Sequence, residues 1–326
     1  MALLRTWCLR VFPWVCTLLF LGYFWHHISR LPEGSAGGLS WVVSSKGQGL
    51  DFSLLLSGDL AQSHRHEGLV VLILVTSHPA HSKHRTAIRK SWAIPDKMAA
   101  YHFQVVFLIG RTTEPELEWR IHKEQVAHGD ILMGNYIDTY RNLTLKVIHG
   151  LKWAADKCQP QYILKTDDDC FVNTGRLAIL LSQSHHLKGL YVGSAFSKDK
   201  RSVIRDPASK WYVSHQDYKP DVYPPYASGI GYILSLDAAR AVLRMSQTTS
   251  PIPMEDAYIG ILAGKAKINL LSSSRFTKFN IKWSLCNYRY LMVIHWVSPQ
   301  EQEGVLERVH QAETACVANK EVNDWK

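Results

Sequence analysis

The feature that most limits the possible folds is an unbroken run of apolar residues from Leu69 to Val75. A strand with one face in water alternates apolar and polar residues, whereas a strand buried on both faces is apolar throughout. Because Thr76 and Ser77 end the run, we expect a short strand that is covered on both sides. This pattern is typical of an α/β protein.

The segments that follow the run alternate between strand and helix patterns. We expect strands over 103–109, 131–132 and 162–164, and helices over 83–92, 114–127 and 143–153. This alternation predicts a mostly parallel central sheet with helices on both faces. Beyond residue 190, aromatic residues, prolines and glycines dominate, which indicates antiparallel strands and long loops. Loops on a rigid scaffold are where substrate sites tend to lie.

Three consecutive carboxylates, Asp167, Asp168 and Asp169, follow the strand expected over 162–164. Ligands of open α/β sheets bind beyond the carboxyl ends of the strands. One carboxylate there could simply cap a helix or lie in a solvated loop. Three adjacent like charges favour a cation instead, and oxygen ligands suit Mg²⁺ or Mn²⁺. The spacing excludes an EF-hand, which needs glycine at the sixth position, where this chain has Val172.

Other charged residues have both a structural and a functional interpretation. Arg85 and Arg89 lie one turn apart at the start of an expected helix, where they would bind a diphosphate or form surface salt bridges. Glu255 and Asp256 precede an apolar segment, where a carboxylate could act as general base or cap a helix. His295 lies in an apolar run, as a core residue or as a further ligand for Mn²⁺.

The N-terminus indicates where the protein is located. Arg5 and Arg10 precede an apolar stretch, and His26, His27 and Arg30 follow it in place of a cleavage site. We therefore favour an uncleaved signal anchor over a cleaved signal peptide. The expected parts are a cytoplasmic tail (1–10), a transmembrane anchor (11–28), a Gly- and Ser-rich lumenal stem (29–66) and a folded lumenal domain (67–326).

A lumenal domain can form disulfides and carry N-linked glycans. Outside the anchor region the cysteines are Cys158, Cys170, Cys286 and Cys316, which allow three pairings if all are oxidised. We favour Cys286 with Cys316, which would tie the C-terminal tail to the body, and Cys170 could stay free. Asn142 begins the sequon Asn-Leu-Thr.

The chain carries a formal net charge of +9, which is compatible with phosphate-bearing ligands or an anionic membrane surface. It has no block of Lys and Arg with interleaved aromatic residues, so we expect no nucleic-acid partner. The residues leave the oligomeric state open.

Read together and in order, several segments resemble the Golgi β1,3-glycosyltransferases of glycosyltransferase family 31. That family includes β1,3-galactosyltransferases and β1,3-N-acetylglucosaminyltransferases. The matching stretches are residues 85–92, 107–110, 128–131, 136–146, 165–173, 209–213, 223–232 and 255–260. The short anchor and stem are also similar to the type II membrane layout of that family.

The resemblance implies a nucleotide-sugar fold of the GT-A type and an inverting, Mn²⁺- or Mg²⁺-dependent transfer from a UDP-sugar. The product would be a β1,3 linkage to an acceptor glycan on a glycoprotein or glycolipid in the Golgi lumen. Galactose is the donor sugar that we favour, and N-acetylglucosamine is the alternative. A non-catalytic lumenal binding or chaperone-like relative is the remaining hypothesis.

The resemblance also assigns roles to residues. It implies metal binding by Asp169, Asp167 and His295, and a general base at Asp256 with Glu255 as the fallback. The residues expected to shape the donor pocket are Arg85, Arg89, Asp138, Lys165, Asp167 and Asp168. Those expected to contact the sugar or the acceptor are Trp211, Tyr226, Gly229 and Gly231. Two departures are Ala227, where many galactosyl members have Cys, and Cys170 after the acidic motif.

Overall fold

The computed structural model describes residues 69–94, 102–183, 188–281 and 283–318. The tail, anchor and stem expected from the sequence lie outside these residues. Within the described part of the chain, no helix is long and apolar enough to cross a membrane.

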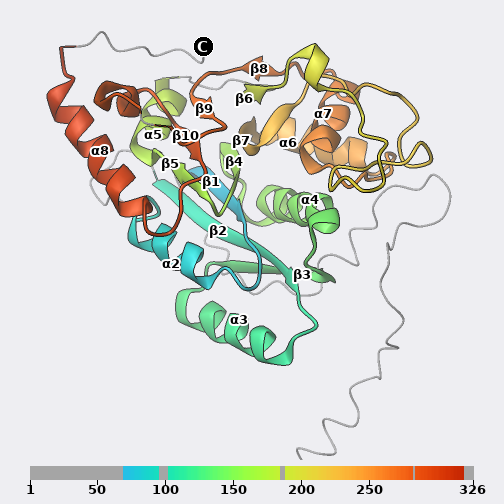
Figure 1. Cartoon of the computed structure of the whole chain (residues 1–326), viewed down its shortest axis with the longest axis horizontal. Helices are drawn as coiled ribbons and strands as arrows, with labels where there is room; N and C mark the ends of the chain where they lie inside the picture. The colour runs from blue at the N-terminus through green and yellow to red at the C-terminus, as the bar shows by residue number, and fades with distance from the viewer. Residues whose placement is uncertain (1–68, 95–101, 184–187, 282, 319–326) are drawn as a thin grey trace, which may run out of the picture. The chain divides into compact units, whose positions relative to one another are not determined.

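A seven-stranded sheet forms the centre of the described domain, in the order β3-β2-β1-β4-β7-β6-β8 (Figure 1). The strands β1, β2, β3 and β4 are parallel, and β7 runs antiparallel to both β4 and β6. This confirms the predicted α/β fold with a mostly parallel sheet. The strands are β1 (Leu69–Thr76), β2 (His102–Arg111), β3 (Ile131–Ile137), β4 (Tyr162–Asp167), β6 (Tyr191–Ala195), β7 (Ala227–Ser235) and β8 (Leu271–Ser272).

The run that opens the domain is buried on both faces, as its composition predicts. Val71, Ile73 and Val75 pack in one apolar cluster, whereas Leu72 and Leu74 pack in the other. Alternate residues of a strand point to opposite faces, so the two clusters lie on opposite sides of the sheet.

Helices cover both faces of the sheet (Figure 1). Apolar residues of α4, α6 and α7 belong to one cluster, and those of α2, α3, α5 and α8 belong to the other. The helices are α2 (Ser82–Lys90), α3 (Pro115–His128), α4 (Leu143–Trp153), α5 (Thr174–Gln183), α6 (Leu236–Ser246), α7 (Glu255–Lys265) and α8 (Gln302–Ala315).

A second, three-stranded sheet has the order β5-β10-β9, formed by β5 (Cys170–Val172), β10 (Val293–His295) and β9 (Phe276–Thr277). The antiparallel pairing of β10 with β5 sets His295 opposite Cys170. Because Cys170 directly follows the acidic triplet, this small sheet brings His295 to the carboxyl end of β4.

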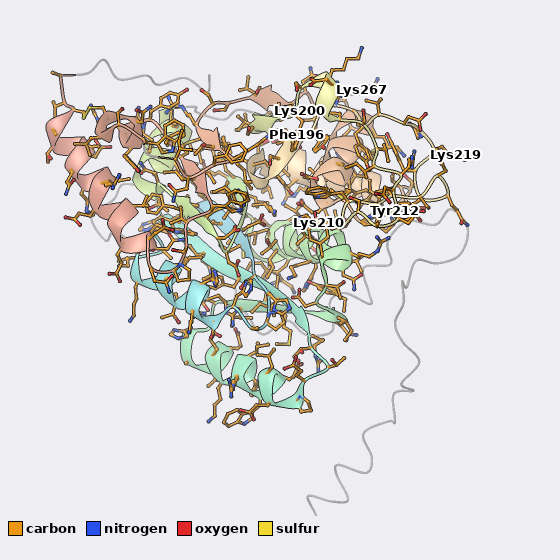
Figure 2. The ribbon with its side chains drawn as sticks, viewed as in Figure 1. Phe196, Lys200, Lys210, Tyr212, Lys219 and Lys267 are labelled. Atoms are coloured by element: carbon orange, nitrogen blue, oxygen red, sulfur yellow. A yellow bond between two sulfur atoms is a disulfide. The ribbon has the colours of Figure 1, made fainter. Side chains whose placement is uncertain are left out.

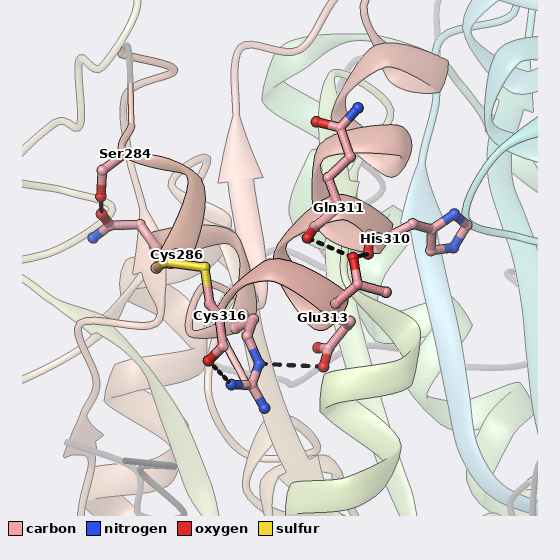
Figure 3. The surroundings of a disulfide bond; sticks show 9 residues. Ser284, Cys286, His310, Gln311, Glu313 and Cys316 are labelled. Carbon is pink, nitrogen blue, oxygen red and sulfur yellow. Dashed lines mark hydrogen bonds and ion pairs between the residues drawn. A yellow bond between two sulfur atoms is a disulfide. The ribbon is translucent and has the colours of Figure 1, made fainter. Parts of the chain in front are cut away.

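The C-terminal helix is joined covalently to the body of the domain. Cys286, in the 3₁₀ helix η5 (Leu285–Arg289), forms a disulfide with Cys316 beyond the end of α8, as we expected from the sequence (Figure 3). Arg289 donates hydrogen bonds to the Cys316 carbonyl, at 2.5 Å, and to Glu313, at 3.2 Å. Cys158 and Cys170 are buried free thiols.

One difference from the sequence prediction concerns the length of a strand, whereas the long loops expected beyond residue 190 are present. The strand expected over 131–132 continues to Ile137, and the residues that extend it, Met133, Gly134 and Tyr136 among them, are mostly buried. The long connection between β6 and β7 contains the 3₁₀ helix η4 (Lys198–Lys200) and an isolated bridge between Ser202 and Val222. This connection forms part of the wall of the candidate site.

Candidate functional site

A cavity of about 560 Å³ lies beyond the carboxyl end of β4. Its wall is formed by the end of β4, the start of β7, the start of α7, the β6–β7 connection and the end of β10. The sequence-predicted residues that line it are Lys165, Asp167, Asp169, Trp211, Tyr226, Gly229, Glu255, Asp256 and His295. The structure therefore brings most of the expected site together from segments that are far apart in the sequence.

The three acids at the end of β4 face three different environments. Asp167 accepts a hydrogen bond from Thr76, its partner on β1, and lies 2.7 Å from the ammonium group of Lys165. Asp168 turns away from the cavity and is buried. Its Oδ2 accepts hydrogen bonds from Ser77, at 2.7 Å, and from His81, at 2.9 Å. The acidic triplet is thus divided between the cavity and the interior.

Asp169 is the acid that faces His295. Its Oδ2 lies 3.4 Å from His295 Nε2. His295 Nδ1 lies 3.0 Å from the carbonyl oxygen of Lys278, which can only accept a hydrogen bond, so Nδ1 carries the proton. This leaves Nε2 directed at Asp169. Metal-binding histidines commonly donate their other ring N–H to a backbone carbonyl in this way.

The donor set of this pair suits a divalent cation. An imidazole nitrogen and a carboxylate oxygen fit Mn²⁺, which often binds through few protein ligands together with substrate phosphates. Among the residues that the structure describes, no three His, Cys, Asp or Glu side chains converge into a complete metal cage. Asp169 and His295 are the candidate ligands at this point, and Asp167 lies against Lys165.

Lys165 is fully buried and connects the two acidic segments. Its ammonium group lies 2.7 Å from Asp167 Oδ1, 2.5 Å from the carbonyl oxygen of Gly229 and 3.4 Å from Glu255 Oε2. Burial alone lowers the pKa of Lys165, but the charges of Asp167 and Glu255 outweigh it and the pKa lies above its usual value. Lys165 is therefore a charged group that holds carboxylates in place.

Glu255 and Asp256 begin α7 and differ in their surroundings. Glu255 is buried and accepts a hydrogen bond from the Tyr232 hydroxyl, at 2.5 Å. Burial raises its pKa to about 7, although the charge of Lys165 opposes this rise. Asp256 is only partly buried, and its oxygens accept hydrogen bonds from the backbone N–H groups of Gly229, at 3.1 Å, and Ala257, at 2.8 Å. Burial raises the pKa of Asp256 as well.

Gly229 lies between these groups. A Cβ atom there would lie 3.5 Å from Glu255, 3.6 Å from Asp256 and 3.6 Å from Lys165. A larger side chain would therefore fill the space beside the three charged groups. Gly231, in contrast, lies opposite Thr166 in the sheet and packs against Val293, so it does not line the cavity.

The basic pair at the start of the domain lies away from the cavity. Arg85 is fully buried and makes a two-bond ion pair with Glu124, and it also donates to the backbone carbonyls of His78 and Pro79. Arg89 donates to Glu124 and makes a two-bond ion pair with Asp130. These contacts match the structural interpretation of the pair, and its role in donor binding stays a prediction.

Asp138 and Asn142 are also engaged in structural contacts. Asp138 forms a buried ion pair with Lys146, at 2.7 Å, and accepts a hydrogen bond from the Gly110 N–H. Neither Asp138 nor Asp168 lines the cavity. Asn142 Nδ2, the atom that a glycan would modify, donates to the Ile137 carbonyl at 2.8 Å. Because Nδ2 has two hydrogens and keeps one after glycosylation, this hydrogen bond does not by itself exclude a glycan at Asn142.

The side of the cavity near Asp256 is aromatic. Tyr226 stacks at a tilt on Phe196, with ring centroids 4.9 Å apart. Trp211 is 45% exposed, and the ammonium group of Lys210 lies 4.7 Å from its ring. Tyr140 lines the same wall, and burial together with the charge of Asp256 raises its pKa to about 12. Exposed aromatic faces of this kind suit the apolar faces of sugar rings.

Several lining residues were not predicted from the sequence: Tyr140, Phe196, Lys200 and Trp296. Trp296 has a φ of 63°, although it is neither Gly nor Asn, and its side chain is 61% exposed. Such a backbone conformation in a bulky residue is strained and is often found at functional sites. The only sequence feature that could have indicated a role for Trp296 in the site is its position directly after His295.

The chain is similar in sequence to known glycosyltransferases. The model of the galactosyltransferase family matches residues 83–274. The chain is 32% identical over 239 residues to beta-1,3-galactosyltransferase 1 of Homo sapiens, which covers 72% of each chain. It is 35% identical over 258 residues to UDP-GalNAc:beta-1,3-N-acetylgalactosaminyltransferase 1 of Homo sapiens, which covers 77% of each chain.

Similar solved structures are more distant. The galactosyltransferase LgtC, in complex with donor and acceptor sugar analogues, has 12% sequence identity and a TM-score of 0.37 over 74% of this chain and 95% of that chain. The apo WbbM bifunctional glycosyltransferase has 12% identity and a TM-score of 0.42 over 78% of this chain and 51% of that chain.

Proposed function

Because the chain belongs to the galactosyltransferase family and is a glycosyltransferase, we propose that it transfers galactose from UDP-galactose to the 3-hydroxyl of an acceptor glycan. The fold is of the GT-A type in this proposal, and the transfer inverts the anomeric centre. The observation that carries the proposal is that Asp256 and the Asp169–His295 pair face one cavity. The cavity thus holds a candidate general base together with a candidate metal site.

Asp169 and His295 are the residues that would hold a divalent cation such as Mn²⁺, in agreement with their donor atoms and with the fixed tautomer of His295. When bound, the ion supplies Lewis-acid stabilisation to the negative charge of the departing diphosphate. Lys165 holds the carboxylate of Asp167 in position at the same end of the cavity.

Asp256 would remove the proton from the acceptor hydroxyl. The oxygen then attacks the anomeric carbon while the bond to the UDP oxygen breaks, and the bonding electrons leave with UDP. One displacement converts an α-linked donor sugar into a β-linked product, so the chain needs no covalent nucleophile. The backbone N–H groups of Gly229 and Ala257 hold the carboxylate in position, and its raised pKa makes it a stronger base.

Glu255 suits this role less well. Its carboxylate is buried, and it is already engaged by Tyr232 and Lys165. The proposal therefore assigns Glu255 to positioning Lys165 and retains it as the alternative base.

The donor sugar is tested by comparing UDP-galactose, UDP-N-acetylglucosamine and UDP-N-acetylgalactosamine. The third is included because a relative with 35% identity is named for that donor. We expect UDP-galactose to give the highest kcat/KM, with linkage analysis showing a β1,3 product. A product formed only from an N-acetylated donor would replace the galactose assignment, and retention of the α configuration would contradict the mechanism.

The base is tested with Asp256→Asn. We expect this variant to bind UDP normally in the presence of Mn²⁺ and to lose transfer by roughly 10²- to 10⁴-fold. The matched control is Asp237→Asn, because Asp237 is the second residue of α6 as Asp256 is of α7, and it bonds Gly189 outside the cavity. Normal turnover by Asp256→Asn would move the base elsewhere. Wild-type protein that transfers no sugar would favour the non-catalytic hypothesis.

We also propose that the protein is a single-pass type II protein of the Golgi membrane, with residues 11–28 as its anchor and the catalytic domain (67–326) in the lumen. Support comes from the apolar stretch after Arg10 and from the Cys286–Cys316 disulfide, which an oxidising compartment favours. Protease digestion of sealed microsomes should leave the folded domain intact. Digestion of that domain without detergent would contradict this topology.

A further inference from the structure

The cavity has an uneven distribution of charge that the proposed reaction does not use. Its carboxylates already have partners: Asp167 and Glu255 face Lys165, Asp169 faces His295, and Asp256 is held by backbone N–H groups. Lys200 and Lys210 also line the cavity. Among the described residues, neither forms an ion pair with a carboxylate.

A third lysine, Lys278, lies close to Lys200 and to the cavity wall. The ammonium group of Lys278 lies 3.5 Å from the ring centroid of Phe196, a residue of the cavity wall. The charge of Lys200 and the opposite charge of Asp256 both act on Lys278, so both groups lie near it. Asp199, the neighbour of Lys200 in the chain, is fully exposed, so solvent screens the attraction between the two charges. Lys200 and Lys278 thus lie near each other, and in the described part of the chain neither forms an ion pair with a carboxylate within 4.0 Å.

The lysines lie on the aromatic side of the cavity, near the candidate base. Lys210 stacks on Trp211 and lies 5.8 Å from the Tyr140 ring. Lys278 contacts Phe196, which in turn packs on Tyr226. The charge of Asp256 acts on the pKa of Tyr140 and of Tyr226, which shows that both rings lie near the base. Figure 2 shows Lys200 with Phe196 above Lys210 with Tyr212, in the same part of the domain.

We propose that Lys200, Lys210 and Lys278 form a cationic rim that binds an anionic group, a carboxylate or a sulfate, on the acceptor glycan. The inference rests on the proposed function, because it assigns the aromatic side of the cavity to the acceptor. An anion there would relieve the repulsion between the lysines, and the aromatic rings would contact the sugar that carries it. The rim selects acidic glycans over neutral ones of the same backbone.

Direct binding tests the proposal without requiring turnover. The full chain in detergent, with UDP and Mn²⁺ present, is applied to an array of matched neutral, sulfated and carboxylated oligosaccharides. We expect the acidic member of a pair to bind roughly tenfold more tightly at low salt, and the advantage to shrink as salt is added. Equal binding within every pair, preference for neutral members or no bound glycan would overturn the proposal.

Substitution then assigns the preference to the rim. Lys200→Gln/Lys278→Gln and Lys210→Gln should each reduce the ratio of acidic to neutral binding, and Lys200→Arg/Lys278→Arg should retain it. Lys198→Gln is the matched control, because Lys198 is an exposed residue of the same 3₁₀ helix and does not line the cavity. Thermal unfolding curves verify that the variants are folded. A ratio that does not change in the glutamine variants would overturn the assignment.

The same variants distinguish an acceptor anion from the diphosphate of the donor. We expect calorimetry to show unchanged UDP affinity in the presence of Mn²⁺. A loss of UDP affinity equal to the loss of acidic-glycan binding would identify the diphosphate as the anion and overturn the proposal. If the protein transferred sugar equally to acidic and neutral glycans, only the inference about the lysines would be wrong. If it bound acidic glycans preferentially but transferred no sugar, that inference would hold and the proposed function would be wrong.

Discussion

Lys165 Nζ lies 2.7 Å from Asp167 Oδ1. The two residues are two positions apart on β4, so their side chains point to the same face of the sheet. The side chain of Lys165 is completely buried, whereas that of Asp167 is 29% exposed toward the cavity. The same ammonium group lies 3.4 Å from Glu255 Oε2. One buried cation therefore fixes the relative position of the acidic triplet and of the segment that carries the candidate base.

The first prediction concerns this cation. Lys165→Met should lower the free energy of unfolding by about 3–5 kcal/mol, because it leaves Glu255 and Asp167 without their buried partner. Urea denaturation measures the change. Lys152→Met is the control, since the Lys152–Asp156 pair is an exposed pair within one helical turn and should cost at most about 0.5 kcal/mol. Equal losses in the two variants would show that Lys165 does not hold the carboxylates together.

The second prediction separates two neighbouring acids. Asp168→Asn should lower stability by about 1–3 kcal/mol, because it weakens the buried hydrogen bonds from Ser77 and His81, while UDP affinity with Mn²⁺ is retained. Asp169→Asn should keep most of its stability and weaken the Mn²⁺-dependent binding of UDP by at least roughly tenfold. Thermal unfolding and calorimetry measure the two properties. If Asp168→Asn also abolished UDP binding, the division of the triplet between cavity and interior would be wrong.

Much of this architecture could be predicted from the sequence. The apolar run at Leu69–Val75 and the alternation of patterns after it specify a buried strand and its covering helices locally. The acidic triplet could be placed because a strand that ends in carboxylates points them to one edge of a sheet. Antiparallel strands beyond residue 190 were also predicted, and β7 confirms them. That β7 pairs with β4 could not be predicted, because its place in the sheet depends on the path of the preceding loop.

The partners of charged residues were the least predictable part. Arg85 and Arg89 look like an anion site in the sequence, yet the carboxylates that bind them, Glu124 and Asp130, lie on or just after α3, 35 to 41 residues away. Only the folded arrangement shows which charges neutralise each other. Lys200 and Trp296 could not be predicted as cavity residues, because loops that are far apart in the sequence bring them to the cavity.

The third prediction concerns pH. The pKa of Glu255 rises from 4.5 to about 7 on folding, chiefly because the group is buried. The folded protein thus keeps a proton that the unfolded chain has released, so this group makes the free energy of unfolding fall as pH rises from 4.5 to 7. Between pH 5 and pH 8 the loss from Glu255 should be about 2 kcal/mol.

Glu255→Gln removes this titration. Its free energy of unfolding, measured with urea at pH 5, 6, 7 and 8, should therefore gain on that of the wild type as pH rises. Glu301→Gln is the control, because the pKa of Glu301 is lowered by its hydrogen bonds with Ser298 and the group is ionised throughout this range. A difference between Glu255→Gln and the wild type that did not vary with pH would show that Glu255 is already ionised at pH 5.

The last prediction tests whether the strain at Trp296 is stored for function. At a φ of 63°, any residue with a Cβ atom is strained, so Trp296→Gly should be more stable than Trp296→Ala by about 1 kcal/mol. At Trp211, which also lines the cavity and whose φ is not positive, the order should reverse, since glycine costs more entropy than alanine.

Both Trp296 variants lose the same exposed ring from the cavity wall, so both should lose kcat/KM for sugar transfer by roughly tenfold. If Trp296→Gly were more stable than Trp296→Ala and as active as the wild type, the strained backbone would not serve to present the ring to the substrate.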